Sequence, residues 1–125
     1  MNPKKEREPK KDTLGNIIKI QPMLDFIILA ELQKSSQNLV NLSEQIVKIF
    51  DGFGVNTGYL SQRITKLVEG GHIEKKPDRK NRLIVHLIIT EDGKVYFKKL
   101  SDELPDSISK ALFIYSTFQK YLTDF

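Results

Sequence analysis

The chain has 125 residues, of which 39% are hydrophobic and 29% are charged, so it can form one domain with a sizeable core and is too short for two of ordinary size. It contains no cysteine, which excludes disulfide scaffolds, thiolate zinc sites and thiol nucleophiles. No apolar run approaches the ~18 residues of a membrane span, and no hydrophobic stretch of the kind found in secretion signals follows the basic N-terminus, so we expect a soluble cytoplasmic protein.

Positive charge is concentrated in two parts of the chain. Lys and Arg number 20 against 16 Asp and Glu, but residues 56–82 alone hold seven basic and three acidic side chains. Residues 1–12 hold five basic and three acidic side chains, and their mixture of Lys, Glu and Pro without periodicity predicts a disordered basic arm. This uneven distribution favours a polyanionic partner, and a solvated basic face is the alternative, since such faces are common on proteins that bind nothing anionic.

The next forty residues are expected to be mostly helical. Apolar residues recur at helical spacing from residue 14 onward, but Pro22 lacks an amide hydrogen and cannot lie inside a straight helix. We therefore predict a short helical segment before Pro22 and a main helix over residues 22–33. Residues 39–42 are interpreted as a brief strand, with Ser43 as the N-cap of a second helix that ends near Asp51.

A third helix and a hairpin are predicted after the turn at residues 52–54. Asn56 or Thr57 caps a helix that runs to about Glu69, with apolar side chains along one face. Two extended segments, residues 72–77 and 83–89, then flank a polar loop of five residues and predict a β-hairpin.

The C-terminal third is predicted to form two helices. Thr90 caps a fourth helix, and Pro105 is expected to end it because proline disrupts a helix interior. A last helix is expected from about Asp106 to Leu122. The order of elements is that of a helix-turn-helix followed by a β-wing, which we classify as α+β and mostly helical.

The solvent-facing side of the third helix is polar and free of acidic residues before Glu69. A DNA major groove admits one α-helix, and Arg, Gln, Thr and Tyr side chains can contact bases or phosphates there. Its candidate DNA-binding residues are Thr57, Tyr59, Gln62, Arg63 and Lys66. Gln62 and Arg63 are expected to read bases.

The predicted hairpin is basic as well. Placed beside a recognition helix, such a hairpin can touch flanking phosphates or enter the minor groove. Its candidate DNA-binding residues are Lys75, Lys76, Arg79, Lys80 and Arg82.

Two segments carry a resemblance to a known family. Residues 55–74, VNTGYLSQRITKLVEGGHIE, resemble the recognition-helix segment of winged-helix regulators, and residues 88–94, IITEDGK, resemble the motif that closes their wing. The pattern is most similar to the MarR family, followed by PadR-like and ArsR-like regulators. The resemblance implies a dimeric repressor that binds a palindromic operator in double-stranded DNA, with a small-molecule effector as a further possibility.

The last predicted helix is apolar on more than one side. Such a helix needs more cover than a small domain can supply, so we expect it to form a homodimer interface with the first helix of a partner chain. The two recognition helices would then lie about 34 Å apart, one turn of DNA. The candidate dimerisation residues are Ile108, Leu112, Tyr115, Phe118 and Leu122. The expected organisation is an arm over residues 1–12, a DNA-binding domain over 13–104 and a dimerisation helix over 105–125.

Two other functions are compatible with the same pattern. A winged helix can serve as a protein-interaction module whose basic face meets an acidic partner, and a DNA-binding protein of replication or plasmid partition can use the same fold. His72 and His86 are expected to be hydrogen-bonded strand residues and not metal ligands, since no cysteine accompanies them. No catalytic motif or phosphate loop is present, so we expect neither an enzyme nor a cofactor site.

Overall fold

The computed structural model describes residues 14–17 and 19–125, so the arm predicted for residues 1–12 lies outside the described part of the chain. The N-terminal helices are α1 (Leu14–Ile17) and α2 (Gln21–Lys34). Pro22 lies in the first turn of α2, where its missing amide hydrogen removes no helical hydrogen bond. The prediction of a short helix, a proline and a main helix is confirmed.

The next helix, α3 (Leu39–Ile49), begins earlier than the sequence pattern indicates. The Asn38 side chain accepts a hydrogen bond from the backbone of Asn41, and the Asn41 side chain reciprocates, which forms a capping box. The predictions of a strand over residues 39–42 and of an N-cap at Ser43 are therefore wrong. Strand pairing occurs just before the cap instead, where Gln37 forms an isolated bridge with Leu87.

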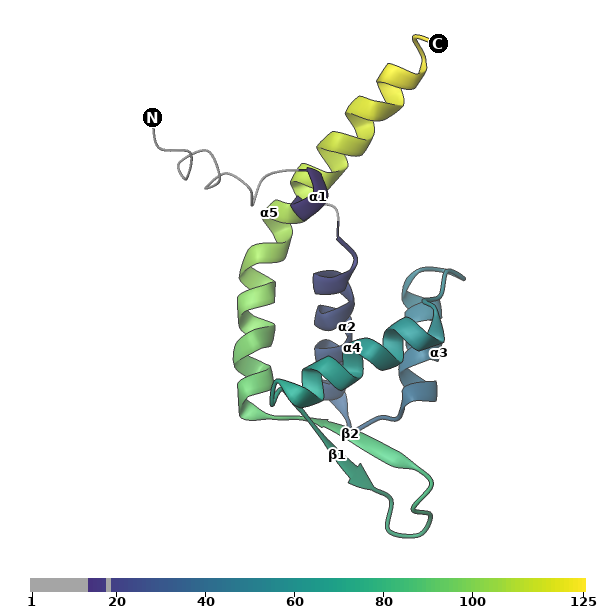
Figure 1. Ribbon diagram of the computed structural model, residues 1–125, viewed down its shortest axis with the longest axis vertical. Coiled ribbons are helices and arrows are strands. Elements are labelled where there is room, and N and C mark those ends of the chain that lie inside the picture. Colours follow the sequence, from purple (N-terminus) through teal and green to yellow (C-terminus); the bar gives the residue numbers. More distant parts are fainter. Residues whose placement is uncertain (1–13, 18) are drawn as a thin grey trace.

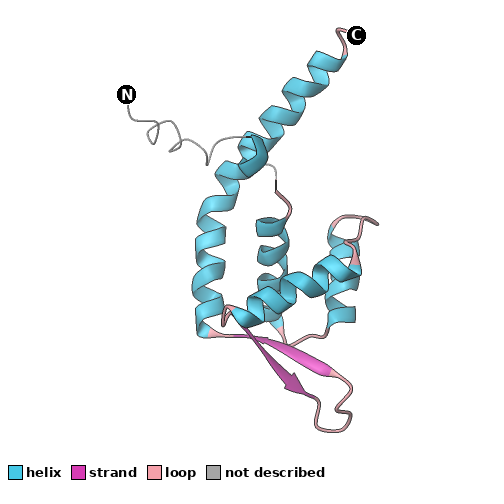
Figure 2. Cartoon of the chain, in the orientation of Figure 1, coloured by secondary structure: helices cyan, strands magenta, loops and turns pink. Residues whose placement is uncertain are grey.

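The helix-turn-helix and the wing follow as predicted. Asn56 caps α4 (Thr57–Glu69) by accepting a hydrogen bond from the amide of Tyr59. Strands β1 (Ile73–Pro77) and β2 (Val85–Ile89) pair antiparallel in the register Ile73 to Ile89 and Pro77 to Val85. Figure 2 shows this hairpin extending from beneath the helices.

A single long helix, α5 (Glu91–Leu122), forms the rest of the chain. Thr90 caps it as predicted, but Pro105 lies inside it, so the predicted break into two helices is wrong. Pro105 is solvent-exposed, and α5 bends part-way along its length (Figure 1) without ending. A proline inside a helix removes one hydrogen bond and either kinks or breaks the helix, and here the helix continues past it.

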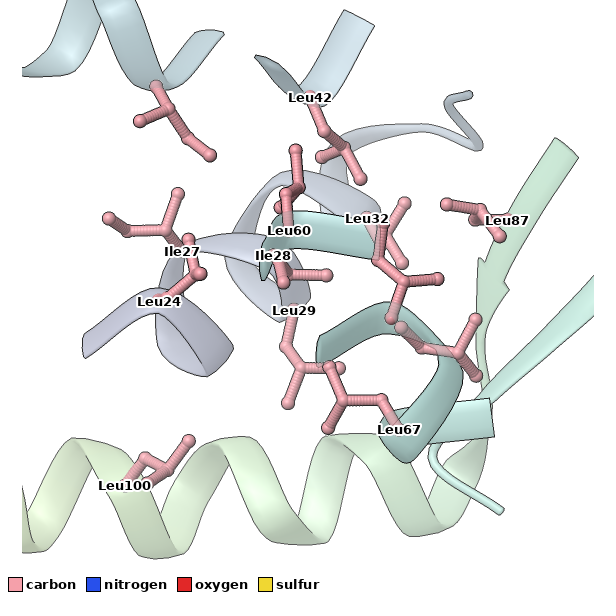
Figure 3. Close-up of a cluster of buried hydrophobic side chains, with 13 residues drawn as sticks. Leu24, Ile27, Ile28, Leu29, Leu32, Leu42, Leu60, Leu67, Leu87 and Leu100 are labelled. Atoms are coloured by element: carbon pink, nitrogen blue, oxygen red, sulfur yellow. The ribbon is translucent and has the colours of Figure 1, made fainter. Parts of the chain in front are cut away.

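The core lies between α2 and the elements around it. Buried leucines and isoleucines of α2 meet those of α3, α4, the hairpin and the first half of α5, with Ile28, Leu29, Leu42 and Leu60 fully buried (Figure 3). Helix α2 is enclosed on several sides, which explains its almost uninterrupted apolar sequence. This arrangement fixes α4 against the body and leaves one of its sides in solvent.

Candidate nucleic-acid interface

Helix α4 presents a polar side to solvent. Leu60, Ile64 and Leu67 are buried against the body, as their i, i+4, i+7 spacing predicts. The expected residues Thr57, Gln62 and Lys66 are exposed on the other side. The structure therefore leaves all three accessible: Thr57 lies in the first turn of α4, and Gln62 and Lys66, four residues apart, share one side of it.

Two further residues of this face were missed in the sequence analysis. Ser61 and Thr65 are exposed and line a recess between α4 and the hairpin, together with Lys75 and Val85. They follow Thr57 at intervals of four residues, and this spacing was a signal that could have identified them. Their short side chains leave room for a polyanion to approach the helix backbone, and their hydroxyls can hydrogen-bond to phosphate.

Arg63 occupies a different environment from the one we expected. Its Nε and Nη2 donate to the two carboxylate oxygens of Asp25, each at 2.9 Å, and Asp25 is fully buried on α2. The hydroxyl of Tyr96 on α5 donates to the same carboxylate at 3.0 Å. Hydrogen bonding to Asp25 raises the pKa of Arg63, which stays charged. The guanidinium thus faces the body of the protein, and the expected base-reading role does not match this placement.

This Asp25–Arg63–Tyr96 cluster connects α2, α4 and α5. Burial, followed by the nearby charge of Asp25, raises the pKa of Tyr96 to about 12, so its phenol remains a donor. The signal in the sequence was an acidic residue, Asp25, within the apolar run of α2. Tyr59 is also half-buried and packs against the core, so it lies at the edge of the polar face and not at its centre.

The predicted basic residues of the hairpin are all exposed. Since neighbouring residues of a strand project to opposite sides, Lys75 lies on the side of α4 and Lys76 on the other. Arg79, Lys80 and Arg82 lie in the loop that joins β1 to β2, beyond the helices (Figure 1). Lys75 therefore lies next to the exposed side of α4, and three cations lie at the tip of the wing.

Side-chain hydrogen bonds hold the wing loop in one conformation. Asp78 accepts from the backbone amides of Lys80 and Asn81, at 2.9 and 3.0 Å, and pairs with Nε2 of His86 at 2.9 Å. These bonds, that of His86 first, lower the pKa of Asp78. Asn81 in turn accepts from the amide of Leu83 at 3.1 Å.

His72 and His86 make different contacts. His86 belongs to the wing loop, whereas His72 stacks on the ring of Tyr96 at 4.7 Å between centroids. His72 Nδ1 is buried and has no hydrogen-bond partner among the described residues, so the expectation of a hydrogen bond there is wrong for this atom. No group of three or more His, Cys, Asp or Glu side chains in the described ranges could hold a metal ion.

The C-terminal half of α5 projects away from the rest of the molecule (Figure 1). All five predicted dimerisation residues are exposed there, from 43% for Ile108 to 64% for Leu112.

Among residues 14–17 and 19–125, no helix is long and apolar enough to cross a membrane.

Several solved structures share this fold. A transcriptional regulator from Clostridium thermocellum is 20% identical, with a TM-score of 0.63 over 85% of this chain and 92% of its own. BldR, a transcriptional regulator from Sulfolobus solfataricus, is 22% identical, with a TM-score of 0.59 over 97% and 84% of the two chains. A winged-helix DNA-binding protein from STIV is 19% identical, with a TM-score of 0.54 over 68% and 88%. No protein-family model matches the sequence, and no curated protein does. The predicted fold class is confirmed, and the chain has the winged-helix fold of these solved structures.

Proposed function

We propose that this protein is a sequence-specific DNA-binding transcriptional regulator and has no enzymatic activity. The single observation that carries the proposal is the continuous exposed surface formed by the polar face of α4 and the basic side of the hairpin. The structures that share the fold are described as transcriptional regulators, which supports the same conclusion.

In this proposal α4 enters the major groove. Gln62 reads a base edge, and Thr57, Ser61, Thr65 and Lys66 contact bases or the adjacent backbone. Arg63 holds α4 in place through Asp25, because its donors are directed inward. Lys75 binds phosphate beside the helix.

The wing binds the DNA that flanks this site. Arg79, Lys80 and Arg82 provide the cations that contact phosphates or enter the minor groove, as proposed from their sequence. Lys76, on the other side of the hairpin, is the wing cation whose contribution we expect to be smallest.

We further propose that two copies associate through the C-terminal half of α5. Apolar side chains that remain exposed on a projecting helix lose contact with water when a second copy covers them. A symmetric dimer presents two α4 helices and therefore matches a palindromic operator. A protein bound to an operator that overlaps a promoter blocks access to it, so the role that we propose is repression.

Fluorescence anisotropy with labelled duplexes tests this function. The purified protein is titrated against DNA from upstream of its own gene and against a scrambled duplex, over a series of salt concentrations. We expect orders of magnitude tighter binding to the first, and a steep decrease of affinity with salt. Equal affinity for both duplexes would contradict sequence-specific regulation and indicate a replication or architectural role. An absence of binding at low salt would contradict DNA binding altogether and favour an acidic protein partner.

A further inference from the structure

Leu83 is an apolar residue of the wing that is exposed to solvent. It lies in the loop between β1 and β2 next to Arg82, and 92% of its surface is exposed. Val40, Ile84 and Val85 are exposed beside it, and together with the start of α3 they line a recess of about 280 Å³. The wing tip therefore combines cations with an apolar surface.

The loop that carries Leu83 is ordered by its own hydrogen bonds. The amide of Leu83 donates to the Asn81 side chain, and the amide of Ile84 donates to the Asn81 carbonyl at 3.0 Å. Asp78, the only carboxylate in residues 78–84, accepts from two loop amides and from His86. Leu83 is thus held at a fixed position in water, where its side chain contributes little to the stability of the fold.

This apolar surface is continuous with the face that carries the proposed function. Val85 lines both the Leu83 recess and the recess that contains Ser61, Thr65 and Lys75. Arg79, Lys80 and Arg82 flank Leu83 in the same loop. A partner that covers the α4 face and reaches the wing would meet an exposed apolar side chain in the same loop as three cations.

We propose that Leu83 packs into the minor groove of DNA beside the major groove that α4 occupies. This inference rests on the proposed DNA-binding function. The minor groove is about 6 Å wide, with a row of phosphates along each rim and sugar and base edges between the two rows. An exposed leucine beside three cations of the same loop complements that arrangement, and apolar side chains such as Leu are used in this way by minor-groove binders.

The test uses the full chain and a duplex enriched from a random-sequence pool by the wild-type protein. Affinity and its salt dependence are measured for Leu83→Ala, Leu83→Met, Arg82→Ala and the control Val95→Ala, which alters an apolar side chain on α5 that is 70% exposed. We expect Leu83→Ala to weaken binding about tenfold with an unchanged salt slope, since leucine displaces no counterion. Leu83→Met and Val95→Ala should bind within about twofold of wild type, whereas Arg82→Ala should reduce the salt slope by about 0.9.

Three results would overturn the inference. The first is an affinity of Leu83→Ala for DNA within about twofold of wild type, and the second is a loss of affinity for Leu83→Met equal to that for Leu83→Ala. The third is a reduced salt slope for Leu83→Ala. In each case thermal denaturation must show that the variant is folded. If the wild-type protein enriches no duplex, the proposed function itself fails, and the minor-groove contact fails with it.

Discussion

At the scale of single residues, Arg63 shows how a tertiary contact can change the role suggested by a helical pattern. Its position on the polar face of α4 favoured base reading, but Asp25 is 38 residues away and contributes a buried carboxylate that the local pattern could not reveal. Removal of one partner from a buried ion pair leaves the other charge uncompensated. Arg63 therefore contributes to the orientation of α4, and through it to any surface that α4 forms.

This leads to a prediction about stability. Arg63→Ala should reduce the free energy of unfolding by about 3 kcal/mol, measured by chemical denaturation, because Asp25 loses its cation. Lys66→Ala, on the exposed side of the same helix, should change it by less than about 0.5 kcal/mol. A double variant, Asp25→Leu with Arg63→Ala, should recover part of the loss. If Arg63→Ala is as stable as the control, the ion pair does not hold α4 in place.

Tyr96 in the same cluster predicts a dependence on alkaline pH. Its pKa is raised to about 12, so the native state keeps the phenol proton after the unfolded state has lost it. The stabilisation from Tyr96 is complete below the ordinary tyrosine pKa of about 10 and is lost as the pH rises from there through about 12. Stability of the wild type should thus decrease over this interval more than that of Tyr96→Phe. If the stability of the two proteins decreased equally with pH over this interval, the result would contradict a buried phenol donor.

At the scale of elements, the junction between the wing and α5 depends on a close approach. Thr90 caps α5 through the amide of Gly93 and also donates its hydroxyl hydrogen to the carbonyl of Gly71, at 2.6 Å. A Cβ atom on Gly93 would overlap the backbone carbonyl oxygen of His72. Only glycine allows α5 to start this near to the hairpin.

Gly93→Ala should accordingly destabilise the protein by about 2–3 kcal/mol, measured by thermal and chemical denaturation. Gly15→Ala is the matched control, because a Cβ there meets no atom within 4 Å. We expect its effect to remain within about 0.5 kcal/mol. Equal stability of the two variants would mean that the junction can shift to accommodate a methyl group.

Most elements could be predicted from the sequence because their signals are local. The spacing of Leu60, Ile64 and Leu67 identifies α4, and the capping chemistry of Asn56 and Thr90 marks two helix starts. Residues 39–42 were misassigned because a four-residue segment with three apolar side chains does not distinguish a strand from the first turn of a helix. The break at Pro105 was wrong because an interior proline can either kink or end a helix, and the local pattern does not distinguish the two. Of the candidate site, the exposed cations were predictable, whereas the inward direction of Arg63 was not.

At the scale of the whole molecule, association in pairs is the central expectation. Leu112→Glu combined with Phe118→Glu places two charges in the proposed interface and should convert a dimer into a monomer, measured by light scattering after size-exclusion chromatography. Val95→Glu, on the exposed side of the first half of α5, should remain dimeric. A wild-type protein that is monomeric at micromolar concentration would contradict the interface.

The uninterrupted course of α5 has a consequence for the spacing of DNA sites. At about 1.5 Å per residue, its 32 residues follow a path of roughly 48 Å, which begins at the wing and whose second half carries the proposed seam between copies. No loop interrupts this path, so the wing and the proposed seam are joined by helix alone, with one proline inside it. We expect such a dimer to favour one separation between half-sites, so the insertion of base pairs at the centre of an operator should lower its affinity for the protein.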